Sequence, residues 1–249
     1  MLQIRAVRRH MCKTQRGDED RRKQYHEYFQ RQNFYYISGG MMNMANVLFV
    51  KANNREQSIS LKLYDAFLSD YREKNPNDNI TELDLFEVEL PYYDGEMYSG
   101  IIKLSKGEEL TTREQNAIAI ANSYADQFLA ADKVVFAFPL WNFTIPAPLL
   151  TYLSYLSQPR KTFTYTAQGP VGLQGDKKVV LLNARGSVYS EGPLAQKEMS
   201  VNYVKSMLAF WGITNIETVV IEGHLQFQDR SQQIIENGLA QAVKVAPNF

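Results

Sequence analysis

The 249-residue chain is 45% hydrophobic and 22% charged, as expected for a globular protein with one large domain or two small ones. Its net charge of zero divides unevenly: residues 1–43 hold nine Lys/Arg and four Asp/Glu, and the remaining 18 Lys/Arg and 23 Asp/Glu leave the body at −5. This balance argues against a nucleic-acid-binding body, and the sequence shows neither a secretory signal nor an apolar run near the roughly 20 residues of a membrane span, so we expect a cytoplasmic location.

Residues 1–43 differ from the rest of the sequence, because they are dense in charge, glutamine and tyrosine and have weak hydrophobic periodicity. A basic arm for nucleic acid or anionic lipid is one interpretation, and a disordered or mis-annotated leader is the other. The second is favoured, because a charge of +5 intermixed with acids is small. We therefore predict a basic N-terminal extension of residues 1–43 and a folded body of residues 44–249.

The first convincing strand is Ala45–Val50, which is followed by a polar loop and a helix. Ser58 and Ser60 are good N-cap residues, and the helix behind them has one apolar face. A strand, polar loop and helix in this order form a ready anion site, because backbone N–H groups, hydroxyl donors and the helix dipole converge. Neither the Walker pattern nor the glycine-rich dinucleotide turn is present, and simple helix capping is the alternative interpretation.

The next elements are a strand over residues 79–86 and then a long irregular connection that begins at Leu90. Thr111 or Thr112 caps a helix that extends to Ala130, because apolar residues recur at helical spacing and the residues after the cap approach a capping box.

The most informative stretch is residues 134–148. It opens as a continuous apolar run typical of a buried central strand, which a proline ends because it has no N–H to donate. Trp141, Asn142 and Phe143 follow, and a helix over about residues 147–156 comes next. Open α/β sheets bind ligands at the carboxyl ends of their strands, so these three residues predict a ligand site. An aromatic plug over the sheet edge is the alternative.

Strands and helices continue to alternate in the remaining third of the chain. The predicted elements are a hairpin in residues 158–175, a strand at 178–183, a helix at 198–212, a strand at 214–222 and a helix at 231–245. In the loop after the strand at 178–183, Gly186 permits close approach of the backbone to a ligand. His224 is interpreted as a surface or dimer-contact residue. The alternation predicts a parallel sheet covered by helices on both faces.

Cysteine and histidine are scarce, which limits the chemistry available to the protein. The body contains one histidine, His224, and the single cysteine, Cys12, lies in the extension. An internal disulfide and a multi-histidine or thiolate metal site are therefore excluded, and the nucleophile-elbow pattern of hydrolases is absent. We expect any reaction to belong to a bound organic cofactor, and the loops after three strands suit a phosphorylated planar ligand.

A resemblance to a known family is carried by four stretches in order, VLFVKANNREQSIS, FPLWNFTIPAPLL, KTFTYTAQGPVGL and ARGSVYSEGP. Together they resemble the FMN-dependent NADH-azoreductase family, which is related to quinone reductases, over about residues 44–249. The resemblance implies a flavodoxin-like, doubly wound α/β sandwich with a five-stranded parallel sheet and a small hairpin excursion. It also implies a homodimer with FMN in each subunit and ping-pong hydride transfer from NADH or NADPH to quinones and to the azo bond of aromatic azo compounds.

The resemblance also assigns the residues that bind FMN. The phosphate is expected on Asn53, Ser58, Ile59 and Ser60. One edge of the ring is expected on Leu140, Trp141, Asn142 and Phe143, and its other end on Ala184, Arg185, Gly186 and Ser187. Asn142 is the candidate stabiliser of the charge that reduction adds to the ring, and no side chain is expected to act as a general acid. The chain departs from the family at Asn53, where serine is common, and at Ser187, where a second glycine is usual.

Two other functions stay open at this point. Flavodoxin-like chains can bind FMN as non-enzymatic electron carriers, although the connection after Leu90 and the hairpin in residues 158–175 look like material for a pocket and a dimer surface. The basic extension would instead suit a nucleic-acid-binding protein. The sequence favours the enzyme, with neither nucleic acid nor a membrane as partner.

Overall fold

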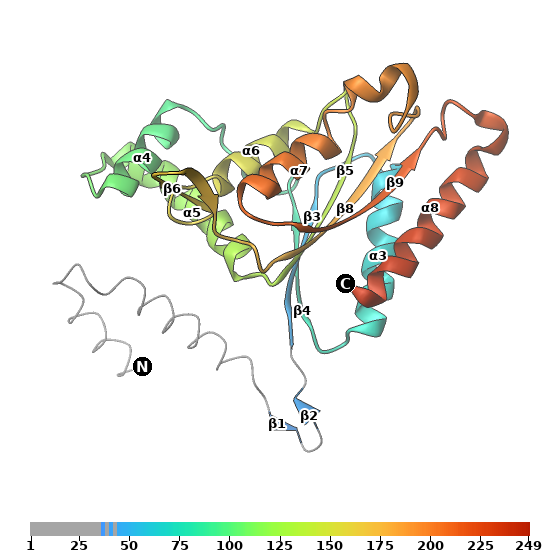
Figure 1. Ribbon diagram of the computed structural model, residues 1–249, viewed down its shortest axis with the longest axis horizontal. Coiled ribbons are helices and arrows are strands. Elements are labelled where there is room, and N and C mark those ends of the chain that lie inside the picture. Colours follow the sequence, from blue (N-terminus) through green and yellow to red (C-terminus); the bar gives the residue numbers. More distant parts are fainter. Residues whose placement is uncertain (1–35, 38–39, 42–43) are drawn as a thin grey trace. The chain divides into compact units, whose positions relative to one another are not determined.

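The structure of the protein is a computed structural model that describes residues 36–37, 40–41 and 44–249 (Figure 1). The chain divides into two units, residues 1–44 and 45–249. In the first unit, strand β1 (Tyr36–Ile37) pairs antiparallel with β2 (Gly40–Met41). The predictions made for the rest of the extension lie outside the described residues.

A five-stranded sheet with parallel pairing throughout forms the centre of the second unit. In spatial order its strands are β4 (Asn79–Asp84), β3 (Asn46–Lys51), β5 (Lys133–Pro139), β8 (Lys178–Arg185) and β9 (Asn215–Glu222). The chain therefore winds from β3 to one edge of the sheet and then back across it to the other, as in doubly wound folds of the flavodoxin type. The predicted fold class and its five parallel strands are confirmed.

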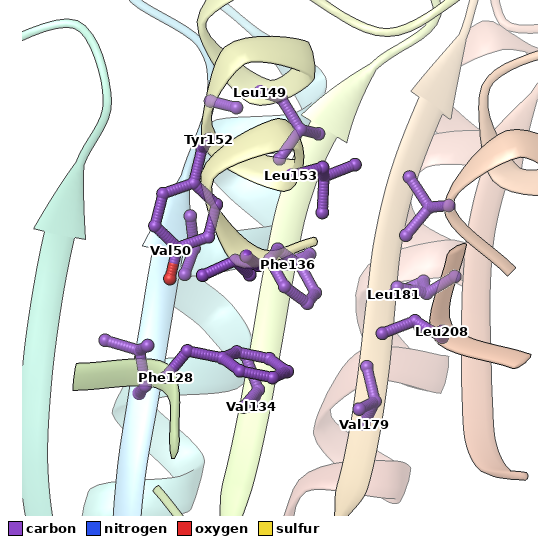
Figure 2. Packing of buried hydrophobic residues seen from close by; sticks show 14 of the residues in the cluster. Val50, Phe128, Val134, Phe136, Leu149, Tyr152, Leu153, Val179, Leu181 and Leu208 are labelled. Carbon is purple, nitrogen blue, oxygen red and sulfur yellow. The ribbon is translucent and has the colours of Figure 1, made fainter. Parts of the chain in front are cut away.

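One face of the sheet is covered by α5 (Thr112–Ala130), α6 (Ala147–Leu156) and α7 (Val201–Phe210) (Figure 1). Figure 2 shows Phe128 of α5 and Tyr152 and Leu153 of α6 around Val134 and Phe136 of β5. All five side chains are fully buried. The central strand therefore meets no water on this face, and its residues Val135 and Ala137 are buried in the core on the other face, so its apolar sequence is continuous.

The opposite face is covered by α3 (Ile59–Lys74) and α8 (Ser231–Val245) (Figure 1). Its core is aromatic: the ring of Phe49 on β3 lies 6.1 Å from that of Phe67 and 5.8 Å from that of Tyr71. Phe249, at the end of the chain, packs its ring 6.0 Å from Phe67. Both predicted helices on this face are confirmed, and each side of the sheet has its own hydrophobic core.

The sequence prediction is wrong for part of the connection after Leu90, because α4 (Gly95–Lys106) forms within it. Asp94 caps this helix by accepting a hydrogen bond from the N–H of Met97 at 2.9 Å. Gly107 ends it in the left-handed conformation, with φ of 76°, which glycine adopts without strain.

A close contact between α4 and α5 holds the added helix on the body. A Cβ atom at Gly100 would lie 2.6 Å from the Cδ1 atom of Ile118, so a larger residue there would require the Ile118 side chain to move. The carboxylate of Glu114 on α5 accepts a hydrogen bond from Lys103 Nζ of α4 at 3.0 Å. Glu114 also completes the capping box with Thr111, which confirms Thr111 as the cap of α5.

The predicted hairpin is present as β6 (Phe163–Thr166) paired antiparallel with β7 (Gly169–Gly172). It docks on the end of α7, where the ring of Phe163 lies 4.5 Å from that of Phe210. The backbones touch at Gly172, because a Cβ atom there would lie 2.0 Å from the backbone nitrogen of Gly212. Gly212 has φ of 88° and follows the last turn of α7, as its sequence position predicts.

Two further features bear on function. Among the described residues, no helix is long and apolar enough to cross a membrane. The same part of the chain contains no cluster of three or more His, Cys, Asp or Glu side chains able to hold a metal ion.

Candidate functional site

The loops that follow β3, β5 and β8 leave the sheet at one edge, because these three strands are adjacent and parallel. Hydrogen bonds continue just beyond the strands: Ala52 N–H donates to the carbonyl of Ala137 at 2.9 Å, and Leu140 N–H donates to the carbonyl of Ala184 at 3.0 Å. The three groups of predicted site residues are therefore brought to a single carboxyl edge, where open α/β sheets bind their ligands.

Asn53 organises the loop after β3. Its side-chain nitrogen donates to the hydroxyl of Ser58 and, at 2.9 Å, to that of Ser60, while its carbonyl oxygen accepts from the N–H of Arg55 at 3.0 Å. The side chain is 1% exposed, and both serines are buried. Each hydrogen of the Asn53 amide thus has its acceptor inside the loop, so this residue positions the two serine hydroxyls.

The first turn of α3 offers several hydrogen-bond donors. Ser58 is the N-cap residue by position, but its hydroxyl contacts Asn53 and Ser60 and does not cap the helix. Within the described part of the chain, the N–H groups of Ile59, Ser60 and Leu61 have no acceptor. The first turn also carries no acidic side chain. This combination of amide and hydroxyl donors at a helix N-terminus favours an anion.

The loop after β5 is a tight turn with an unusual backbone. Trp141 N–H donates to the Thr144 carbonyl at 2.9 Å, and Thr144 N–H donates back to the Trp141 carbonyl at 3.0 Å. Between them Asn142 and Phe143 both have positive φ, 50° and 72°. Asparagine tolerates this conformation, but for phenylalanine it is strained, and strain of this kind concentrates at functional sites.

Aromatic rings flank this turn. Trp141 is half-buried, and its ring meets that of Phe86 edge-on at 6.2 Å. Phe143 is 38% exposed, and its ring lies 6.3 Å from that of Tyr189 in the loop after β8. The side chain of Asn142 is exposed at the tip of the turn, and Leu140 is half-buried at its base. The turn therefore places aromatic side chains beside an exposed amide.

Arg185, at the end of β8, points into the protein. Its Nε atom donates to Glu222 at 2.9 Å, its Nη1 atom lies 3.3 Å from a Glu198 carboxylate oxygen, and its side chain is 6% exposed. Glu222 also accepts the N–H groups of Tyr189 and Ser190, at 2.8 and 3.1 Å. The guanidinium therefore ties the loop after β8 to the carboxylates of Glu198 and Glu222, and the assignment of Arg185 to the segment facing the ring stays a prediction.

The two carboxylates of this network are held ionised. Burial pushes the pKa of Glu198 upward, but hydrogen bonds from the Ser200 hydroxyl and from the N–H groups of Val201 and Asn202 outweigh it, so the pKa is lowered. The pKa of Glu222 is lowered in the same way: burial opposes ionisation, and hydrogen bonds from the loop together with the Arg185 charge outweigh it. Glu198 thereby caps α7 and pairs with Arg185 at the same time.

The other three residues predicted after β8 differ in role. Ala184 is buried as part of the strand. At Gly186 an added Cβ would lie 2.7 Å from the Cδ1 atom of Leu225, so the glycine packs closely against that side chain. Ser187 is half-buried, and its hydroxyl makes no hydrogen bond with any described residue. Ser187 is therefore the residue of this group whose side-chain hydroxyl is available to donate a hydrogen bond to a ligand.

Comparison with known proteins identifies this arrangement. Residues 45–246 match a protein family described as having a flavodoxin-like fold. The chain is 61% identical over 208 residues to FMN-dependent NADH:quinone oxidoreductase 3 of Bacillus cereus, a match that covers 83% of this chain and 100% of the relative. It is also similar to the crystal structure of an azoreductase from Bacillus anthracis, with a TM-score of 0.81, 60% identity and coverage of 83% and 100% of the two chains. This chain belongs to the FMN-dependent NADH-azoreductase family.

A second solved structure of this azoreductase family comes from Bacillus anthracis and was determined in complex with FMN. Its TM-score to this chain is 0.76 at 28% identity, and the match covers 82% of this chain and 99% of that one. The family and fold inferred from the four sequence motifs are confirmed. The individual contacts assigned to FMN stay predictions.

Three residues of this azoreductase-family chain escaped the sequence analysis: Lys197, Glu198 and Glu222. Glu198 precedes Ser200 and the helical pattern of α7, so a carboxylate cap was available as a signal. Glu222 is 37 positions from Arg185, and no local pattern pairs them. His224 is half-buried; its Nδ1 atom is buried with no hydrogen-bond partner among the described residues, and burial lowers its pKa.

Proposed function

We propose that this protein is an FMN-dependent reductase that transfers electrons from NADH to quinones and to the azo bond of aromatic azo compounds. The observation that carries the proposal is the donor set after β3: two buried serine hydroxyls oriented by Asn53 beside uncapped N–H groups of α3. The chemistry of that set fits a phosphate dianion, because the uncapped N–H groups and one of the two mutually hydrogen-bonded serine hydroxyls can donate, and the first turn carries no acidic side chain. When bound, FMN supplies two-electron redox chemistry that no side chain can perform.

Several residues have roles that follow from their surroundings. Ser58, Ser60 and the first-turn N–H groups of α3 would hold the phosphate. Asn142 presents an exposed amide that can donate to a polar atom at a ring edge, where added charge is stabilised by a nearby donor. Trp141 and Phe143 would supply apolar aromatic contacts for planar molecules and displace water from them.

A shared aromatic site also favours ping-pong kinetics. The electron donor and the acceptor both carry flat rings, and Phe143 is the exposed aromatic residue of the turn after β5, so the two substrates would occupy the same site in succession. Initial rates measured at several concentrations of each substrate test this idea. Parallel double-reciprocal lines support it, and intersecting lines contradict it. The same assay with NADPH in place of NADH defines the preference for the donor.

We further propose that the enzyme is a homodimer. Large apolar side chains are exposed on α4, α6 and the hairpin, which lie on one side of the sheet: Tyr98, Leu104, Leu150, Tyr165 and Val171. A contiguous patch formed by several such side chains is typical of a protein–protein interface. Sedimentation equilibrium measures the mass directly, and a monomer at micromolar concentration refutes the proposal. The cytoplasmic location stays a prediction that cell fractionation can test.

The decisive experiment begins with purified protein. Its absorbance spectrum is recorded, the flavin is released and identified, and NADH oxidation is followed with a benzoquinone and with an azo dye. Bound FMN with turnover of both acceptors supports the proposal. Bound FMN without turnover indicates an electron carrier, and a protein that neither contains nor takes up FMN refutes the proposal.

A further inference from the structure

A positive charge lies over the exposed aromatic residue of the site. Lys197 is the last residue of the 3₁₀ helix η1 (Gly192–Lys197), and its Nζ atom lies 5.2 Å from the centroid of the Phe143 ring. Phe143 in turn meets the ring of Tyr189. The two rings and the ammonium group therefore come from three separate segments that converge beside the carboxyl edge of the sheet.

The backbone next to Lys197 is anchored to the same turn. Met199 N–H donates to the carbonyl of Phe143 at 2.9 Å, and the hydroxyl of Thr144 donates to the carbonyl of Met199 at 3.4 Å. Glu198, between them, is held by Arg185 and by the N-terminus of α7. The backbone two residues after Lys197 is thus hydrogen-bonded to the turn that carries Phe143.

The ammonium group of Lys197 is available to an anion. The residue is exposed, and no acidic side chain in the described part of the chain pairs with it. Its neighbour Glu198 is buried, and the carboxylate of that residue is occupied by Arg185 and by N–H groups of α7. The Phe143 ring contacts the ammonium group of Lys197 through a cation–π interaction. The N–H hydrogens of Lys197 that point away from the ring are free to donate.

We propose that Lys197 and Phe143 form an acceptor subsite that selects planar aromatic molecules with an anionic substituent, a sulfonate or a carboxylate. The aromatic part would rest against Phe143 and Tyr189, and the anionic group would pair with the ammonium of Lys197. This inference rests on the proposed function, because it names the class of acceptor that the same site prefers.

The test measures binding without turnover. Protein loaded with FMN is titrated by calorimetry, in the absence of NADH, with a naphthoquinone sulfonate and with the uncharged parent naphthoquinone. Lys197→Gln removes the charge and keeps most of the stem, whereas Lys197→Arg keeps the charge. The matched control is Lys178→Gln, which removes one exposed lysine at the opposite end of β8, where the chain enters the sheet.

We expect Lys197→Gln to raise the Kd of the sulfonate about fivefold relative to that of the parent quinone, because a partly exposed ion pair contributes about 1 kcal/mol. Lys197→Arg should restore the preference, and Lys178→Gln should not change it. Raising the salt concentration should weaken sulfonate binding to the unaltered protein and have little effect on the Lys197→Gln variant. In steady-state reduction, the change should appear in the KM of the sulfonate and not in kcat.

An unchanged ratio of the two Kd values in Lys197→Gln overturns the inference, as does an equal change in Lys178→Gln, which would indicate a general effect of net charge. Reduction of the uncharged quinone by the unaltered enzyme is assayed in parallel. If that reduction is absent, the proposed function fails, whereas the Kd ratio still reports on the subsite. The two failures are therefore distinguishable.

Discussion

Replacing Arg185 by methionine should destabilise the protein without leaving a large cavity. The guanidinium is 6% exposed and joins Glu222 and Glu198 through contacts of 2.9 and 3.3 Å. Methionine fills a similar space, so the expected loss comes from the charge and its hydrogen bonds and not from a cavity.

The size of the loss in unfolding free energy depends on which hydrogen bonds Glu198 and Glu222 keep when Arg185 is replaced. Removing one member of a buried ion pair usually costs about 3–5 kcal/mol, because the other charge is left without compensation. Here both carboxylates keep several donors: Glu198 those of Ser200 and α7, and Glu222 those of Tyr189 and Ser190. We therefore expect the low end, about 3 kcal/mol of unfolding free energy at pH 7.

Urea unfolding with excess FMN and without FMN measures this cost. With a slope of about 2 kcal/mol per molar urea, the midpoint should fall by about 1.5 M. The pH dependence provides a second check. Both carboxyls have a pKa lowered from 4.5 in the folded state, so their stabilising contribution is present above that pH and is lost as the pH falls through the folded values. The difference in unfolding free energy between Arg185→Met and the unaltered protein should therefore shrink over the same range of pH.

Two results would refute this reasoning. A midpoint shift below about 0.3 M would show that the ion pairs contribute almost nothing beyond the remaining hydrogen bonds. A difference that stays constant between pH 7 and pH 3 would show that the loss comes from packing. Arg72→Met is a matched control, because its ion pair with Glu82 is exposed and should cost less than about 1 kcal/mol.

Three further predictions concern the site and the extension. Replacing Ser58 and Ser60 together by alanine should weaken FMN binding by about 1–3 kcal/mol, measured by fluorescence titration, whereas Ser123→Ala on the exposed face of α5 should leave it unchanged. A chain that starts at Met44 should keep its fold, flavin and turnover; insolubility or loss of flavin would place the domain boundary elsewhere. Asn142→Ala and Asn142→Gly should both lower the midpoint potential of bound FMN by about 30 mV if the amide stabilises added charge, because one lost hydrogen bond is worth about 1.4 kcal/mol. Glycine relieves the positive φ and alanine does not, so a shift seen with alanine alone would indicate backbone strain.

Hydrophobic periodicity was sufficient to predict the sheet and most of its covering helices. The strand at residues 133–139 is buried on both faces, so its apolar run is continuous, and the helix at 112–130 has both a capping box and a helical stripe. These signals are local and strong. The order of the strands was not predicted, because adjacency in a sheet depends on contacts that no short window of sequence contains.

The helix at residues 95–106 was missed because its sequence contains two glycines and follows a proline-containing segment. Gly100 weakens the local preference for a helix, but it packs closely against Ile118 of α5. Tertiary contact therefore outweighed propensity. Asp94 as N-cap, with buried Met97 and Ile101 four residues apart, was the signal that could have indicated the helix.

The candidate site was predicted in its location but not in its internal connections. Loops at the ends of three parallel strands must share an edge, so sequence reasoning placed them together. It could not assign Asn53 to orienting Ser58 and Ser60, or Arg185 to pairing with Glu198 and Glu222. Such pairings depend on side-chain directions that only the folded chain defines.

The segment of residues 191–197 has a consequence for how this family could diversify. It contributes no buried residue to the core, yet it is held at both ends, by the bonds of Ser190 to Glu222 and of Met199 to Phe143. A segment that is anchored at both ends and contributes no buried residue can change its sequence without disturbing the core. New lengths and charges can be introduced there at little cost in stability, and each version would present a different side chain above Phe143. Acceptor preference could then evolve independently of the sheet that supports it.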